Sequence, residues 1–185
     1  MDFALPYFDI AHPVIRHCIT PTVPLTPPLA DAIQLRAKGV PARELLERAK
    51  QIRSSFKGLL LVNDRIDVCL AAGADGIHLP SHRIAPQRIK RRFGKNLIIG
   101  VSCHDLDELR RAEQEGADYA YLSPIFSSAS KPGYGPPLGL KLLADAVMAV
   151  RIPILALGGI TPANEAQCIE AGAAGIAGIS YFGYS

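Results

Sequence analysis

Short apolar segments with strand character recur along the chain, and most of them precede a stretch in which apolar residues have helical spacing. Near-continuous apolar strands that alternate with amphipathic helices are typical of a parallel sheet covered by helices. The expected strands cover residues 12–20, 31–36, 58–63, 76–79, 97–103, 119–125, 154–159 and 175–180. The expected helices cover residues 41–56, 65–72, 86–93, 105–115, 140–150 and 162–171. This α/β pattern predicts a closed (β/α)8 TIM barrel, with a doubly wound open sheet as the alternative.

Two helices of a regular barrel have no counterpart in this pattern. Residues 21–28 hold four prolines, which remove backbone donors and forbid a helix at the place of the first one. The sequence ends at Ser185, where the eighth helix is expected to begin. These two helices are neighbours in a barrel, and without them apolar strand surface would face water. We therefore expect the N-terminal segment or a second subunit to cover this surface, which makes a homo-oligomer the expected assembly.

Length and composition limit the classes of protein to which the chain can belong. With 185 residues, of which 49% are hydrophobic, a single TIM-barrel domain over residues 1–185 is expected. No apolar run is long enough to span a bilayer, and the N-terminus lacks the basic region and long apolar core of a signal peptide. The net charge of +3 is too small to favour nucleic acid as a partner. Four scattered cysteines without a Cys-x-x-Cys pair fit reduced thiols, so a cytoplasmic protein is expected.

The segment from Ile154 to Pro162 joins an apolar strand to a helix through Gly158-Gly159. Thr161-Pro162 predicts an N-cap hydroxyl followed by proline at the first helical position. Bare backbone N–H groups beside a helix N-terminus form a site for an anion such as phosphate. A tight turn that needs glycine for its dihedral angles is the simpler interpretation of two glycines alone. The strand over 175–180 also ends in small residues, and this second strand end favours a phosphate site.

Polar residues stand at the ends of several expected strands, or in the loops that follow them. Each alone has a structural explanation, such as Asp64 as a helix cap. In a barrel, however, these strand ends lie on one rim, which is the rim that carries TIM-barrel active sites. Arginine, lysines, hydroxyls and glycine backbone on one rim predict a pocket for more than one phosphate group. The residues are Gln34, Arg36, Lys38, Asn63, Asp64, Ser102, Ser128, Ser130 and Lys131.

Six stretches, in chain order, resemble the thiamine phosphate synthase family, which includes thiazole tautomerases with the same barrel. The resemblance runs from about residue 31 to residue 180. The stretches are Gln34-Leu-Arg-Ala-Lys38, Val62-Asn-Asp-Arg65, Gly73-Ala-Asp-Gly-Ile-His78, Gly100-Val-Ser-Cys-His104, Pro124-Ile-Phe126 with Ser128-Ala-Ser-Lys131, and Ala156-Leu-Gly-Gly-Ile160.

The resemblance implies a synthase that joins hydroxymethylpyrimidine diphosphate to a thiazole phosphate and releases diphosphate, so the expected partners are small phosphorylated heterocycles. It implies that the pyrimidine diphosphate is held by Gln34, Arg36, Lys38, Asn63 and Lys131, of which Arg36, Lys38 and Lys131 are the expected catalytic residues. Ser102 is expected to touch the diphosphate, and Asp64 to bind Mg²⁺. The thiazole substrate is expected at Ser128 and Ser130, with its phosphate on the backbone of Gly158, Gly159, Ile179 and Ser180.

The chain departs from the family pattern after the expected strand over 76–79. The family's second magnesium carboxylate follows there, whereas this chain has Pro80-Ser-His-Arg83, with Arg83 at the place of an aspartate. A cation there should weaken Mg²⁺ binding, although its guanidinium could itself hold diphosphate. The change looks more like the tautomerase branch, but that branch can use a histidine near Pro124, and proline cannot move protons. His78 and His104 are the remaining imidazoles near the rim.

Three functional hypotheses follow from these residues. A thiamine phosphate synthase comes first, because the predicted diphosphate-binding residues would be surplus to a tautomerase. A thiazole tautomerase of the same family is the second hypothesis. The third is a non-catalytic barrel that binds phosphate ligands, since a fold does not by itself define an activity.

Overall fold

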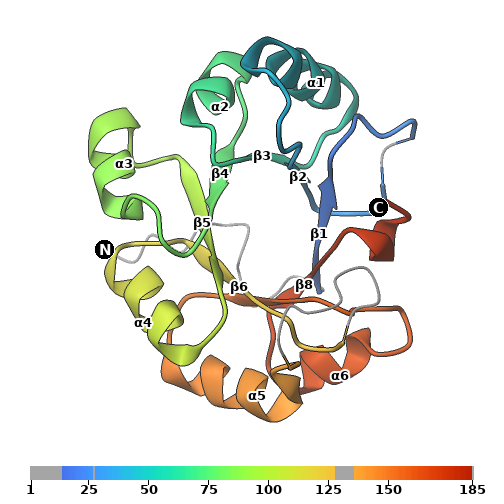
Figure 1. The fold of residues 1–185 in the computed structure, drawn as a ribbon, viewed down its shortest axis with the longest axis vertical. Coiled ribbons are helices and arrows are strands. Elements are labelled where there is room, and N and C mark those ends of the chain that lie inside the picture. Colours follow the sequence, from blue (N-terminus) through green and yellow to red (C-terminus); the bar gives the residue numbers. More distant parts are fainter. Residues whose placement is uncertain (1–13, 27, 128–135, 185) are drawn as a thin grey trace.

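The computed structural model describes residues 14–26, 28–127 and 136–184. Eight parallel strands form a closed barrel, in which each strand pairs with the next and β8 pairs with β1 (Figure 1). The strands are β1 (Ile15–Thr20), β2 (Ala32–Leu35), β3 (Leu59–Asn63), β4 (Gly76–Leu79), β5 (Ile98–Cys103), β6 (Tyr119–Leu122), β7 (Ile154–Leu157) and β8 (Gly175–Gly178). The helices are α1 (Ala42–Ser55), α2 (Ile66–Ala72), α3 (Pro86–Phe93), α4 (Leu106–Gln114), α5 (Gly139–Ala149) and α6 (Glu165–Glu170). The predicted TIM barrel is confirmed, and the open-sheet alternative is wrong.

Side chains along each strand alternate between the inside of the barrel and the layer beneath the helices, as the strand period of two requires. In β6, Tyr119 and Tyr121 belong to the inner apolar cluster, whereas Ala120 and Leu122 pack in the outer one. Gly100 on β5 makes room for the large inner rings, because a Cβ atom at this position would lie 2.0 Å from Tyr119 Cζ. The inside of the barrel is therefore a packed core rather than a channel.

The segment after β7 differs from its prediction. Helix α6 begins at Glu165 with Asn164 as its N-cap, and residues 162–164 form a turn. Asn164 Oδ1 accepts the Thr161 N–H at 2.8 Å, and Asn164 Nδ2 donates to the Gly159 carbonyl at 3.0 Å. The predicted Thr161 cap and the helix N-terminus directly beside Gly158-Gly159 are therefore wrong. The Asn164 side chain closes a turn at this place instead.

The barrel lacks regular helices at the two predicted places within the described residues. Between β1 and β2 the described chain has no helix, and after β8 it forms only η2 (Ser180–Phe182), a short 3₁₀ helix. Figure 1 shows coil and η2 beside β1, where the other strands have a longer helix. The side chains of Tyr181, Phe182 and Tyr184 pack against the outer apolar cluster and cover part of this side. Residues 1–13 lie outside the described residues, and a covering second subunit stays a prediction.

Two further expectations concern membranes and cysteines. No helix in the described part of the chain is long and apolar enough to cross a membrane. All four cysteines are free and buried, as predicted. Burial raises the pKa of the Cys18, Cys69 and Cys103 thiols to about 12 and that of Cys168 to about 11. At neutral pH these thiols are protonated, so they act as small apolar packing residues.

Candidate active site

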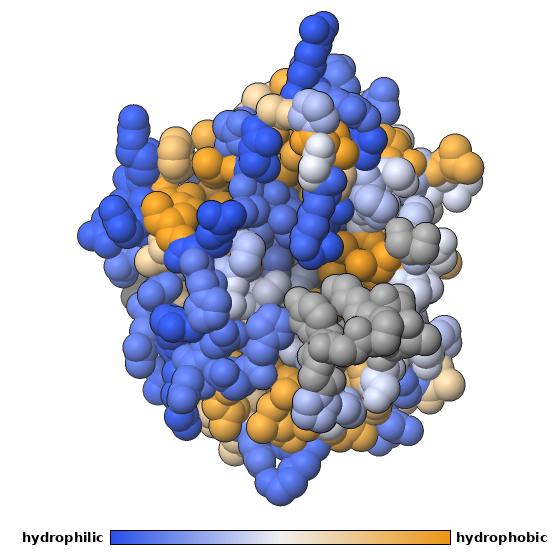
Figure 2. Space-filling view, viewed as in Figure 1, coloured by the Kyte–Doolittle hydropathy of each residue, from blue (hydrophilic) through white to orange (hydrophobic). Residues whose placement is uncertain are grey.

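A cavity of about 720 Å³ opens at the carboxyl ends of the barrel strands. Hydrophilic side chains gather above and to the left of the middle of the face that Figure 2 shows. The described lining holds four cationic side chains and one carboxylate, so the cavity is electropositive. The cations belong to Arg36, Lys38, Arg65 and Arg83, and the carboxylate belongs to Asp64.

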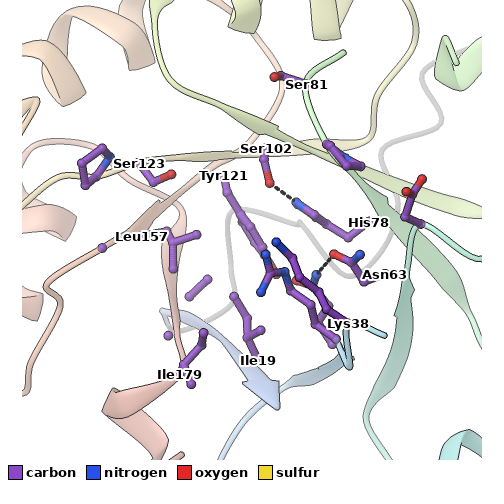
Figure 3. Close-up of a pocket in the computed structure, with 18 of the residues that line it drawn as sticks. Ile19, Lys38, Asn63, His78, Ser81, Ser102, Tyr121, Ser123, Leu157 and Ile179 are labelled. Carbon is purple, nitrogen blue, oxygen red and sulfur yellow. Dashed lines mark hydrogen bonds between the residues drawn. The ribbon is translucent and has the colours of Figure 1, made fainter. Parts of the chain in front are cut away.

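Every predicted site residue that the structure describes lines this one cavity. Figure 3 shows Lys38, Asn63, Ser102 and Ile179, which come from different strand ends, around the same space. The predicted residues found in the lining are Gln34, Arg36, Lys38, Asn63, Asp64, Ser102, Gly158, Gly159, Ile179 and Ser180. Ser128, Ser130 and Lys131 lie outside the described residues. The geometry brings the set together, while the role of each residue stays a prediction.

Gln34 and Asn63 form a polar pair at the bottom of the cavity. Ile33 and Leu35 pack in the outer apolar cluster, so Gln34 between them faces the inside of the barrel and is buried. Its Nε2 donates to Asn63 Oδ1 at 3.0 Å, which orients both amides. Gln34 Oε1 is buried and has no hydrogen-bond partner among the described residues. A buried acceptor without a partner costs about 1–3 kcal/mol, so a ligand that donates a hydrogen bond here would gain affinity.

Asp64 follows β3 in a backbone conformation that is rare for a residue with a side chain. Its φ of 52° lies in the left-handed region. The Asp64 N–H donates to the His78 carbonyl on β4 at 2.9 Å, which fixes this turn. The carboxylate Oδ2 then lies 3.0 Å from an Arg83 guanidinium nitrogen. Strained backbone of this kind concentrates at functional sites, because the surrounding structure must hold it.

The described residues do not fit a divalent cation. Mg²⁺ binds through oxygen ligands, usually including one or two carboxylates. Asp64 is the one carboxylate in the described lining, and Arg83 already pairs with it. Within residues 14–26, 28–127 and 136–184, no group of three or more His, Cys, Asp or Glu side chains could hold a metal ion. The magnesium prediction for Asp64 thus stays a prediction without geometric support.

Two buried histidines and two tyrosines form a polar network inside the barrel. His78 Nε2 lies 2.9 Å from Ser102 Oγ, and His78 Nδ1 lies 3.0 Å from the Tyr119 hydroxyl (Figure 3 draws the first contact). His17 Nδ1 lies 3.0 Å from the Tyr121 hydroxyl. Burial lowers the pKa of His17 to about 3 and the pKa of His78 well below its usual value. Both imidazoles are therefore neutral, and His78 orients the Ser102 hydroxyl at the cavity without adding charge.

His104 places a third imidazole in the cavity lining. Its Nδ1 lies 2.8 Å from the Ser123 carbonyl oxygen, so Nδ1 carries the proton and donates. The His104 backbone N–H donates to Glu108 Oε2 at 2.8 Å, which fixes the end of β5 against α4. The ring is only partly buried, in contrast to His78.

At the ends of β7 and β8 the cavity is lined by glycines and uncharged residues rather than by charged side chains. Gly158 and Gly159 have φ angles of 92° and 66°. A Cβ atom at Gly159 would lie 2.5 Å from the Ser127 carbonyl oxygen, so only glycine allows the two loops to approach this closely. Ile179 and Ser180 follow the paired strand β8 and line the same cavity. The two adjacent strand ends that the sequence marks are therefore side by side.

Several lining residues were not predicted from the sequence. Arg65, Ser81, Tyr121 and Ser123 contribute to the cavity wall. The alternation of two tyrosines in β6 is a signal that could have identified Tyr121 as an inward-facing residue. The sequence offers no comparable signal for Ser81, whose place depends on the path of the loop after β4.

The fold and the cavity define a TIM-barrel protein with an electropositive ligand site at the carboxyl ends of its strands. A family model described as thiamine monophosphate synthase matches residues 25–182. The chain therefore belongs to the thiamine monophosphate synthase family.

Similar proteins agree with this membership. The chain is 45% identical over 154 residues to a thiamine-phosphate synthase of Methanoculleus marisnigri, covering 82% of this chain and 73% of the relative. It is 44% identical over 154 residues to a thiamine-phosphate synthase of Moorella thermoacetica, covering 82% and 73%. A solved structure of a thiamine phosphate pyrophosphorylase from Pyrococcus furiosus matches with a TM-score of 0.78 and 34% identity, over 90% of this chain and 86% of the other.

Proposed function

We propose that this protein is a thiamine-phosphate synthase, a transferase that couples hydroxymethylpyrimidine diphosphate to a thiazole phosphate and releases diphosphate. The observation that carries the proposal is the convergence of the predicted residues on one electropositive cavity in a chain of this family. The thiamine-phosphate synthases of Methanoculleus marisnigri and Moorella thermoacetica are 45% and 44% identical to the chain over 82% of its length.

The charge of the cavity fits two phosphorylated substrates. Lys38 and Arg36 form no ion pair within the described part of the chain, so their charges are available to a ligand. We assign them to the diphosphate of the pyrimidine substrate, together with the predicted Lys131. Gln34 and Asn63 lie beside them and are assigned to the same substrate, whose donor groups would satisfy Gln34 Oε1.

The second phosphate is assigned to the ends of β7 and β8. Gly158 and Gly159 allow close approach of a ligand to bare backbone, and Ile179 and Ser180 lie on the adjacent strand end. The helix N-terminus that the sequence predicted beside these glycines is absent, because α6 begins only at Glu165. Backbone N–H groups of the two loops would therefore hold this phosphate without a helix dipole.

The chemistry follows from this arrangement. The thiazole nitrogen supplies an electron pair to the pyrimidine methylene carbon, the carbon–oxygen bond breaks, and its electron pair leaves with diphosphate. Negative charge develops on the departing oxygen while positive charge develops on the methylene carbon. Fixed cations aimed at the departing oxygens stabilise this charge without reorganisation. Each charge-assisted hydrogen bond is worth about 1.5–3 kcal/mol, so several converging donors lower the barrier substantially.

One assay tests the proposal and separates it from its alternatives. The purified chain is supplied with both substrates, and diphosphate release, thiamine phosphate formation and thiazole isomerisation are followed in parallel. The expected result is equal formation of diphosphate and thiamine phosphate. Isomerisation without diphosphate would identify a tautomerase, and binding without turnover would identify a non-catalytic barrel, so either outcome would overturn the proposal.

Thiazole isomerisation is the second candidate because of one observation. His104 places a partly buried imidazole in the cavity, with Nδ1 bonded to the carbonyl that precedes Pro124. With Nδ1 as the donor to this carbonyl, Nε2 is the ring nitrogen at which a proton would be exchanged with a substrate. The proposed coupling reaction does not require such a group.

A further inference from the structure

Arg83 and Asp64 form an ion pair at the cavity. Arg83 lies in the loop between β4 and α3, and Asp64 lies directly after β3. An Arg83 guanidinium nitrogen lies 3.0 Å from Asp64 Oδ2, and both residues line the cavity. The side chain of Arg83 is 60% exposed, so much of its guanidinium remains open. A guanidinium carries five N–H donors, and the contact with one carboxylate oxygen leaves donors for another ligand.

The loop that carries Arg83 is held from its other side as well. His82 Nε2 lies 3.2 Å from Oε1 of Glu108 on α4. The other Glu108 oxygen accepts the His104 backbone N–H, so this carboxylate connects the loop to the end of β5. The neighbouring residues 82 and 83 therefore contact two different elements, α4 and the end of β3, and these contacts restrict the conformations of the loop. A preorganised cation stabilises a bound anion without the entropic cost of ordering the loop.

The pair also determines what else the site can bind. A divalent cation at Asp64 would lie close to the Arg83 guanidinium, which is 3.0 Å from Oδ2, and the repulsion between the two positive charges would weaken its binding. The described lining has four cationic side chains and only this one carboxylate, so its net charge is positive. A guanidinium matches two phosphate oxygens with two parallel N–H donors, whereas an ammonium acts as a point charge. The positive charge that a metal would bring to a diphosphate is therefore supplied by the chain itself.

We propose that Arg83 is a diphosphate-binding residue, held by Asp64, and that this protein binds diphosphate without a divalent cation. The inference rests on the proposed function for the identity of the ligand, since a diphosphate is the group that the synthase reaction releases. It assigns to Arg83 direct contact with the diphosphate oxygens, and to Asp64 the positioning of the guanidinium.

Calorimetric titration of the purified chain with inorganic diphosphate tests this inference. In buffer with EDTA, the wild-type protein is expected to bind diphosphate, and excess Mg²⁺ is expected to change the dissociation constant less than about threefold. Arg83→Gln should weaken binding about tenfold or more, because a charge-assisted contact is lost. Arg83→Lys should lie between the two, because it keeps the charge and loses the two-point geometry.

Arg110→Gln is the matched control. Arg110 is similarly exposed, at 54%, and pairs with a single aspartate, Asp107, at 3.5 Å on α4. This variant should bind diphosphate like the wild type. Circular dichroism and thermal unfolding of each variant establish that it is folded.

Two results would overturn the inference: wild-type binding that requires Mg²⁺, or unchanged binding by folded Arg83→Gln. The titration needs neither substrate nor turnover, so it is independent of the coupling assay. If the protein binds diphosphate without metal but forms no thiamine phosphate, the proposed function fails while the assignment of Arg83 stands.

Discussion

Gly159 shows how one residue can set the shape of the cavity. Its φ of 66° lies in the left-handed region, and an added Cβ would lie 2.5 Å from the Ser127 carbonyl oxygen. Gly159→Ala should therefore lower the free energy of unfolding by about 2–4 kcal/mol through backbone strain and steric overlap. Gly73→Ala is the matched control, because Gly73 has a similar φ of 62° and no atom within 4 Å of the added Cβ. Urea unfolding should give a loss of about 1–2 kcal/mol for that control, from the left-handed backbone alone. Equal losses in the two variants would refute the steric account.

Lys38 is the residue whose loss should affect catalysis most clearly. Its ammonium lies in the cavity without an ion-pair partner in the described chain, so removal should not unfold the protein. Lys38→Ala should lower kcat/KM for the coupling reaction about 10- to 150-fold, equivalent to one charge-assisted hydrogen bond of about 1.5–3 kcal/mol. Lys141→Ala is the control, because Lys141 is exposed and pairs with Asp145 on α5. A Lys38 variant with wild-type kinetics would remove this residue from the proposed site.

For individual residues, the sequence predicts which side chains lie on the same rim of the barrel, but it does not predict the hydrogen bonds and ion pairs that each one forms. Gln34, Lys38, Asn63 and Gly159 could be placed together because parallel strands bring their carboxyl ends to one rim. The Asp64–Arg83 pair could not be predicted, because it depends on the path of the loop after β4 and on a left-handed φ at Asp64. Loop paths are not encoded in the apolar period from which strands and helices are inferred.

At the scale of elements, aspartates connect alternate strands at the amino end of the barrel. Asp31, Asp75 and Asp118 each precede an even-numbered strand, and each accepts a backbone N–H from the strand before it. Asp118 also pairs with Lys90 on α3, with both side chains less than 20% exposed. Near its amino end, each odd-numbered strand here has a backbone N–H group without a partner in the sheet. The aspartate carboxylate accepts that hydrogen bond.

Asp118→Ala should destabilise the fold without affecting chemistry. It removes the acceptor of the Ile99 N–H and the carboxylate partner of the Lys90 ammonium, which keeps its hydrogen bond to the Gly116 carbonyl, and we expect a loss of about 2–4 kcal/mol in the free energy of unfolding. Asp118→Asn keeps one acceptor oxygen and should lose less. Asp145→Ala, which breaks an exposed pair, should cost less than about 1 kcal/mol. Because Asp118 lies at the opposite end from the cavity, kcat/KM should stay within about twofold at a temperature where the variant is folded. A large kinetic effect would contradict this separation of the two ends.

The order and type of the elements were predictable, while their ends were not. Period-two and helical apolar patterns locate the strands and helices because burial dictates them. The start of α6 was misplaced, since Thr161-Pro162 has the composition of a helix start but the Asn164 side chain closes a turn there first. That choice depends on a contact with the Gly159 carbonyl, which arises only when the loop is folded.

At the scale of the whole molecule, the inside of the barrel contains imidazoles that must stay neutral. His17 and His78 are buried beside the tyrosine hydroxyls of β6. The sequence gives no warning of this, because a histidine in an apolar strand could face either side of the sheet. Burial lowers the pKa of His17 to about 3 and that of His78 in the same direction. The stability of the whole fold is thereby linked to pH.

Acidification should therefore unfold this protein through the inside of its barrel. An imidazole in the unfolded chain has a pKa near 6.5, so below this pH the unfolded state binds protons that the native state does not. The stabilisation is fully present above pH 6.5 and is lost as the pH falls toward the folded pKa, at about 1.4 kcal/mol per pH unit for each imidazole. His17, with its folded pKa of about 3, should remove about 2 kcal/mol between pH 8 and pH 5, and His78 adds a loss of the same sign. An ordinary stability of about 5–15 kcal/mol makes this loss measurable.

Urea unfolding at several pH values between 8 and 5 measures this loss, and His17→Gln should reduce the proton uptake on unfolding from two toward one. NMR of the imidazole rings provides a second measurement that does not depend on that variant folding: neither His17 nor His78 should titrate in the native protein in this range. The pKa of Asp67 is lowered to about 2, chiefly by its hydrogen bond to Arg65. In the native protein this carboxylate therefore stays ionised between pH 8 and pH 5 and does not contribute to the measured loss of stability. A native imidazole of either residue that titrates above pH 5, or an unfolding free energy that does not change with pH, would show that the barrel interior tolerates the charge.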